Sequence, residues 1–270
     1  MVDQVMSSLG KAHSTIRNNL VVLWFPALFS TAVAVFIMLA AIIVLLPVMP
    51  DLLTTPDILS TSPEILNAGS SRMLLILGLA IPVVVVANAG AVYMQARAVK
   101  GEQVDTASFF SGVRTIGARV LIGNLVVWGC YVLVLVLSVL IFAQRLGTLL
   151  LEYEVDSVLM PEVFLHALPL MVIGTLLVSM ISVLFSMWAR VLALREVSVM
   201  QALSSGARFV LQNFLTVAVV LLATWLLTTF TQPLVERLPL GRLLVLVFSY
   251  VARVYMSVFL MHFYIDKTGM

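Results

Sequence analysis

The sequence predicts an all-α, polytopic membrane protein with six transmembrane helices. The chain of 270 residues is 62% hydrophobic and only 10% charged, whereas a soluble domain carries about a quarter charged residues. Its apolar runs reach or exceed the roughly 20 residues that a helix needs to cross a bilayer. An internal repeat, described below, divides these runs into three similar units.

Six apolar segments are long enough to be spans. Pro26 and Pro82 fall inside the first two, where we expect them to kink helices that neighbouring helices then support. The expected spans are 20–46, 73–93, 120–143, 168–188, 214–230 and 238–264.

Basic residues are distributed unevenly between the two sides of these spans. Lysine and arginine gather in the N-terminal segment, in the loops 97–119 and 190–208, and in the C-terminal tail. Acidic residues predominate on the other side, for example in the run "LEYEVDS". The positive-inside rule therefore places both termini in the cytoplasm, in agreement with an even number of spans.

Three segments of the chain resemble one another. Each begins with valine and a small or acidic residue, reaches a glycine, continues with basic residues and an asparagine, and then enters a span. A second similarity joins the cytoplasmic ends of the even-numbered spans, which read "QARAV", "WARVL" and "VARVY". The sequence thus predicts one integral membrane domain, 1–270, built from three parallel repeats at about 1–97, 98–190 and 191–270. The repeated segments start at Val2, Val104 and Val197, and their glycines are Gly10, Gly112 and Gly206.

The start of each repeat has the periodicity of an amphipathic helix, because its apolar residues recur at three- and four-residue steps. Asp105 and Thr106 are the candidates for the N-cap of the second of these helices. A moderately apolar helix with a basic edge, next to a span, is expected to lie in the headgroup layer. Two interpretations remain open: an elbow that orients each hairpin, and a sensor of anionic lipid or curvature.

The third repeat, with "ALSSGARFVLQNF" ahead of a span, and the closing "ARVYMSVFL" carry a family resemblance. They resemble the YciC-type six-span bacterial inner-membrane proteins, and more distantly the membrane domain attached to some glycerophosphodiester phosphodiesterases. The resemblance implies a multi-pass protein of the bacterial inner (plasma) membrane with a role linked to envelope lipids. It supplies no catalytic residues, and this chain has no soluble phosphodiesterase domain.

No enzymatic motif is found in the sequence. His13, His166 and His262 lie far apart, and no metal-ligand spacing, nucleophile elbow or glycine-rich phosphate loop occurs. The single cysteine, Cys130, excludes an intramolecular disulfide. We therefore expect no enzymatic activity, no cofactor, no metal and no nucleic-acid partner.

Two polar stripes mark the fourth and sixth spans. Their members are spaced at three- and four-residue steps, so that each set lies on one helix face. One interpretation is that small hydroxyl side chains let helices pack closely. The other is that the stripes line a groove whose arginines bind an anionic phospholipid headgroup or a membrane partner. The stripe of span four is Thr175, Ser179, Ser182, Ser186 and Arg190, and that of span six is Ser249, Arg253 and Ser257.

Arg253 is the most unusual residue of the chain, because it falls inside a predicted span in which no acid can neutralise it. An arginine at the middle of the bilayer costs about 2.5–3.5 kcal/mol on insertion scales. The repeat aligns it with Arg97 and Arg190, which lie at cytoplasmic helix ends. On that register span six is short, the segment after Arg253 runs along the inner interface, and the guanidinium snorkels to phosphate. A charge near the midplane is the alternative.

Asn88 and Asn124 are two further polar residues within predicted spans. Ala87, Ala89 and Gly90 surround Asn88 and favour a close helix contact. We expect both asparagines to act in helix packing.

The leading functional hypothesis is a non-enzymatic membrane protein that binds lipid or a membrane partner. It would act in envelope lipid handling or as an accessory subunit of a larger membrane complex. The alternative is a small transporter or channel with a path lined by spans four and six.

Overall fold

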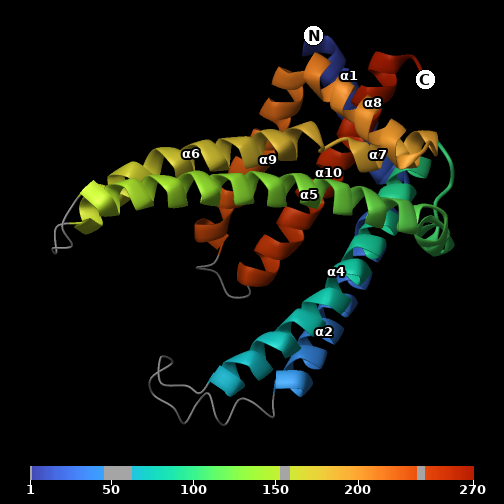
Figure 1. Cartoon of the computed structure of the whole chain (residues 1–270). Coiled ribbons are helices and arrows are strands. Elements are labelled where there is room, and N and C mark those ends of the chain that lie inside the picture. Colours follow the sequence, from blue (N-terminus) through green and yellow to red (C-terminus); the bar gives the residue numbers. More distant parts are fainter. Residues whose placement is uncertain (1, 46–62, 153–158, 236–240) are drawn as a thin grey trace. The chain divides into compact units, whose positions relative to one another are not determined.

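The computed structural model describes residues 2–45, 63–152, 159–235 and 241–270, and every regular element within them is a helix (Figure 1). Among the residues described, five helices are long and apolar enough to cross a membrane, or six if one bent pair counts as a single span. The predicted all-α class is confirmed, and the long apolar helices fit a multi-pass membrane protein. The helices are α1 (Val2–Asn18), α2 (Val21–Leu45), α4 (Pro63–Val99), α5 (Thr106–Glu152), α6 (Leu159–Leu184), α7 (Trp188–Arg195), α8 (Val199–Gln212), α9 (Phe214–Val235) and α10 (Gly241–Thr268).

Each expected span coincides with a long helix, but two boundaries differ from the expectation. The second amphipathic helix and the third span form one uninterrupted helix, α5. The fourth span is broken at 185–187, between α6 and α7. Residues 46–62, 153–158 and 236–240, expected to belong to outer loops on which the predicted orientation partly depends, lie outside the described residues.

The chain divides into two compact units, which are described separately. The first contains Met1–Leu121 and Thr228–Met270, and the second contains Ile122–Leu227.

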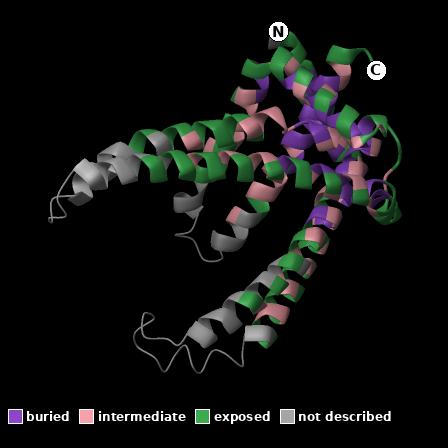
Figure 2. Cartoon of the chain, in the orientation of Figure 1, coloured by how far each residue is buried: buried purple, intermediate pink, exposed green. Residues whose placement is uncertain are grey.

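The core of the first unit contains Ala87, Met94 and Phe109. The Phe109 ring lies 4.8 Å from that of Phe29 and 5.3 Å from that of Phe25, centroid to centroid, so that α2 and the start of α5 meet through aromatic contacts. On α4, burial is concentrated toward the end at Val99, whereas the residues before Val85 whose exposure is described are exposed or half-buried (Figure 2). Exposed apolar surface of this kind on α2 and α4 is what a lipid-facing hairpin presents.

Gly112 and Gly90 bring α4 and α5 into close contact in the first unit. A Cβ added at Gly112 would lie 2.5 Å from Cβ of Tyr93, and one at Gly90 would lie 2.9 Å from the carbonyl oxygen of Phe109. No side chain fits at either position unless the backbone moves.

The second unit packs around Trp188, which is 5% exposed. A Cβ at Gly123 would lie 2.2 Å from the Trp188 ring, and one at Gly206 would lie 3.1 Å from its backbone nitrogen. Glycines on α5 and α8 therefore accommodate the first residue of α7.

Side-chain caps begin two of the helices predicted at repeat starts. The Asp105 carboxylate accepts a hydrogen bond from the backbone N–H of Ser108 at 2.9 Å, and Ser198 and Gln201 form a capping box at the start of α8. The side-chain hydrogen bond from Ser108 is the main cause of a lowered pKa at the Asp105 carboxyl, with the backbone bond second. Of the two residues expected to cap this helix, the structure selects Asp105.

Asparagines end α1 and α8. Asn19 donates from both its backbone and its side-chain nitrogen to the carbonyl of Thr15, and Asn213 does the same to the carbonyl of Phe209. After Asn213 the chain turns by 93° into α9. Asn124, which the predicted repeat aligns with these two asparagines, lies inside α5, where the helix continues.

Candidate functional site

Along α10, the side chains change from exposed to buried at Arg253. Val247 and Phe248 are exposed, whereas nearly every residue from Val254 to Tyr264 is buried. Arg253 itself is exposed, and its side chain makes no hydrogen bond or ion pair within the described part of the chain. The exposed guanidinium thus lies where the helix passes from an open stretch into the protein core.

After Arg253, α10 continues without a break to Thr268, and its last part is enclosed by protein. The physical reason is that α1 and α4 pack against it, so that its apolar side chains are covered by helices and not by lipid. The predicted course of this segment along the inner interface stays a prediction.

The predicted stripe on α10 is only partly open. Ser249 is half-buried, Arg253 is exposed, and Ser257 is 6% exposed. A ligand that reaches Arg253 can therefore meet Ser249, one turn away, whereas Ser257 belongs to the core.

The stripe on α6 is exposed at Thr175, Ser179 and Ser182. Ser182 does not stand alone, because its hydroxyl lies 2.9 Å from the hydroxyl of Tyr131 on α5. A second contact between the same two helices places a Cβ built at Gly174 3.3 Å from the Ser138 hydroxyl. Part of this stripe therefore serves helix packing.

Ser186 and Arg190 lie at the break between α6 and α7. In a regular helix the carbonyl of Ser186 would accept from the backbone N–H of Arg190, but here it accepts a hydrogen bond from the Arg190 guanidinium. The Ser186 hydroxyl is buried and has no hydrogen-bond partner among the described residues. Arg190 thus compensates a freed carbonyl, a role that the sequence did not indicate.

Asn88 and Asn124, which we expected to act in helix packing, differ in their exposure. Asn88 is exposed, whereas its neighbours Ala87, Ala89 and Gly90 are buried. Asn124 is half-buried on α5, next to the glycine that contacts Trp188.

A polar contact between α1 and α10 was not found by sequence reasoning. Asp266 accepts hydrogen bonds from the hydroxyl of Ser8 at 2.9 Å and from the ammonium of Lys11 at 2.6 Å. One face of α1 and one face of α10 therefore carry matched polar groups, which fix the register of the two helices.

Two histidines extend the same contact. Nδ1 of His13 lies 2.9 Å from the hydroxyl of Tyr255, and Nε2 of His262 lies 2.9 Å from the hydroxyl of Thr15. The sequence does carry a signal for it, because residues 8, 11 and 15 share one helical face, as do residues 255, 262 and 266.

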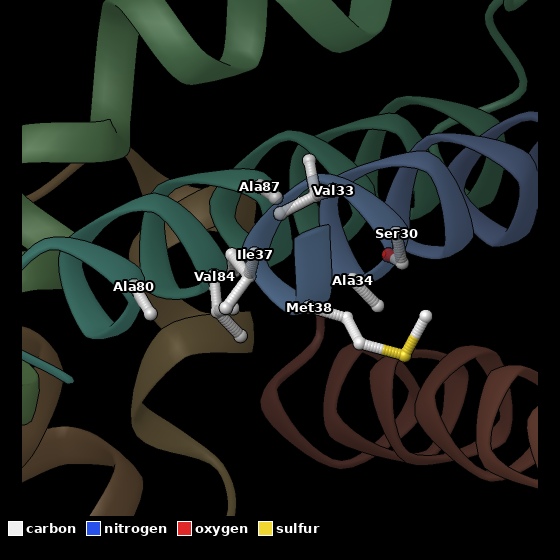
Figure 3. A pocket seen from close by; sticks show the side chains of 8 residues that line it. All are labelled: Ser30, Val33, Ala34, Ile37, Met38, Ala80, Val84 and Ala87. Atoms are coloured by element: carbon white, nitrogen blue, oxygen red, sulfur yellow. The ribbon is translucent and has the colours of Figure 1, made fainter. Parts of the chain in front are cut away.

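A groove of about 450 Å³ lies between α2 and α4 in the first unit (Figure 3). Its lining is apolar except for the hydroxyl of Ser30, and both of its walls belong to candidate spans. Such a groove suits hydrocarbon and offers no charged group to a polar ligand. The lining residues are Ser30, Val33, Ala34, Ile37, Met38, Ala80, Val84 and Ala87.

Comparisons with known proteins give no assignment: no family model, no curated protein and no solved structure matches this chain. The resemblance to YciC-type proteins therefore stays a prediction. Within the described residues, no group of three or more His, Cys, Asp or Glu side chains could hold a metal ion.

Proposed function

We propose that this protein is a non-enzymatic, multi-pass membrane protein that binds anionic phospholipid through Arg253. On this proposal it resides in a bacterial inner membrane with both termini in the cytoplasm. It handles envelope lipids or serves as the lipid-binding accessory subunit of a larger complex.

The observation that carries the proposal is the exposed guanidinium of Arg253, which has no hydrogen bond or ion pair with any described residue and lies at the edge of the buried part of α10. A permanent cation in contact with a membrane requires a counter-charge or water. Arginine matches a phosphate oxygen pair through two parallel hydrogen bonds. A phospholipid phosphate at the inner interface meets both requirements, and Ser249 one turn away offers a further hydrogen bond.

We also propose that the chain consists of three parallel repeats. Two observations support them: Asn19 and Asn213 end their helices through the same pair of bonds, and Asp105 and Ser198 cap theirs at the same place in the repeat. In the first and third repeats the helix before the hairpin is separate from the span. In the second repeat it is continuous with the span.

The proposal is tested by replacing Arg253 with leucine in the full-length protein. We expect phosphatidylglycerol binding, measured by native mass spectrometry of protein released from detergent, to weaken about tenfold or more, because a hydrogen bond to a charged group contributes about 1.5–3 kcal/mol. The matched control is Lys267→Gln, which removes one exposed cation from the same helix. Unchanged lipid retention in a folded Arg253→Leu protein would exclude this role for Arg253.

A transporter is the second candidate, and the break at 185–187 in span four favours it, because interrupted helices often form the binding sites of transporters. The contact between Ser182 and Tyr131 supports packing instead. Under packing, Tyr131→Phe removes only this hydrogen bond, whereas Ser182→Ala also removes the bond that the Ser182 hydroxyl donates to the carbonyl of Val178. Tyr131→Phe should then lower stability by about 0.5–1.5 kcal/mol, and Ser182→Ala by at least as much.

The measurement that separates these two readings is the movement of fluorescent phosphatidylglycerol across proteoliposome membranes. Packing predicts no difference between the wild type and either variant. A path lined by the stripe predicts protein-dependent movement that Ser182→Ala slows and Tyr131→Phe does not.

A further inference from the structure

The helix α8 presents two different faces. One face is buried and includes Ala202, Gly206 and Val210. The side turned away from it carries two large apolar residues that are strongly exposed, Met200 at 68% and Leu211 at 66%. A helix that only packed on its own protein would not need apolar side chains on both sides.

The outward edge of α8 consists of Met200, Ser204, Arg208 and Leu211, all of which are exposed. Their spacing of four, four and three residues places them along one line of the helix. The edge is therefore apolar at both ends, with a hydroxyl and a guanidinium between them. This is the composition of a helix edge that meets lipid headgroups.

The direction of α8 agrees with such a contact. Only Asn213 separates it from α9, and the two helices are bent by 93°. Since α9 is apolar enough to cross a bilayer as part of this pair, a helix at nearly a right angle to it runs along the membrane surface. Leu215, in the first turn of α9, is 69% exposed and extends the apolar edge from Leu211 into the span.

We propose that the outward edge of α8 docks into the headgroup layer of an anionic membrane leaflet. Met200 and Leu211 insert among the upper acyl carbons, and Arg208 contacts lipid phosphate between them. The inference rests on the proposed membrane placement of the protein, but it concerns a surface that does not include Arg253. The occupant is the anionic lipid surface, because the edge continues a membrane span and its only charge is positive.

The edge of α1 shows the same composition. Met6 and Leu9 are exposed at its start, Leu20 is exposed just beyond its end, and Arg17 is exposed between them. Asn19 and Leu20 are the only residues between α1 and the span α2. The test below is made on α8, and the same measurement can be made on α1.

The test uses the full-length protein with Cys130→Ser and a single cysteine introduced by Leu211→Cys. An environment-sensitive dye on this cysteine is quenched with acrylamide, a neutral quencher, in vesicles of phosphatidylcholine alone and of phosphatidylcholine with phosphatidylglycerol at about 7:3. We expect stronger protection from quenching in the anionic vesicles. Gln103→Cys, in the exposed segment between α4 and α5, provides the reference for a dye in water.

Arg208→Gln should shift the docking equilibrium about fivefold toward the undocked state, which corresponds to about 1 kcal/mol for one basic residue near an anionic surface. Arg195→Gln, which removes an exposed arginine of α7, is the matched control and should leave the protection unchanged.

Three results would overturn the inference. In the first, the dye at 211 is quenched as readily as the dye at 103 in both kinds of vesicle. In the second, Arg195→Gln lowers the protection as strongly as Arg208→Gln. In the third, the protection follows the protein density in the vesicles and not their phosphatidylglycerol content, which would indicate a second copy of the chain as the occupant. The result for α8 docking can be distinguished from the result for lipid binding at Arg253. Loss of retained lipid in Arg253→Leu together with an unprotected position 211 refutes only the docking of α8, and the reverse pattern refutes only the lipid site.

Discussion

Replacing Gly112 with alanine is expected to destabilise the protein, whereas the same substitution at Gly10 is expected to stabilise it. A Cβ at Gly112 would lie 2.5 Å from Cβ of Tyr93, an atom that no rotamer change can move, so that α4 and α5 must separate. Forcing one extra carbon into a close-packed contact costs about 1–3 kcal/mol. Nothing lies within 4 Å of the corresponding position at Gly10, where alanine gains about 0.8–1.0 kcal/mol of helix propensity.

Thermal unfolding of both variants in the same detergent checks this pair. The two glycines occupy the same place in the predicted repeat, so that each variant serves as the control for the other. Melting temperatures that move in the same direction by similar amounts would contradict the packing of Gly112 on Tyr93.

Replacing Asp266 with alanine is expected to release α1 from α10. The Asp266 carboxylate is the shared acceptor for Ser8 and Lys11, and Ser8 is fully buried. Leaving a buried hydroxyl without its partner costs about 1–3 kcal/mol. Lys11→Gln removes only a half-exposed ion pair and should cost no more than about 1 kcal/mol.

Amide hydrogen exchange along residues 2–18 distinguishes the two variants. Asp266→Ala should accelerate exchange throughout α1, whereas Lys11→Gln should leave most of its protection in place. Asp266→Asn, which keeps an acceptor for Ser8, should behave more like Lys11→Gln. If α1 stays as protected in Asp266→Ala as in the wild type, the polar contact does not hold this helix.

The long helices were predictable because hydropathy and length decide whether a segment can span a bilayer. The predicted boundaries of α2 and α9 agree with the structure to within a few residues. The continuity of α5 was not predicted. Asn19 and Asn213 each cap the carbonyl four residues earlier and end a helix, whereas the helix runs on past Asn124. Asparagine therefore ends a helix at two of these positions and not at the third, and the local sequence does not show which will happen.

The break in span four could not be predicted from residues that disfavour helix, because the sequence at 185–187 contains neither glycine nor proline. It lies just before Trp188, whose ring and backbone are fitted against Gly123 and Gly206. Contacts distant in sequence of this kind are invisible to a local pattern. Likewise, Ser257 and Arg253 belong to one stripe in the sequence, and only the packing of α1 and α4 on α10 separates a buried residue from an exposed one.

We propose that this protein works by binding anionic phospholipid, and extraction of the full-length protein in native membrane patches tests this most directly. Mass spectrometry then identifies every lipid and protein that remains with it. We predict a defined anionic phospholipid, retained in proportion to the protein and lost in Arg253→Leu. A stoichiometric protein partner found together with that lipid would make this chain an accessory subunit. Lipids in the same proportions as the bulk membrane, unchanged by Arg253→Leu, would exclude specific binding of anionic phospholipid through Arg253.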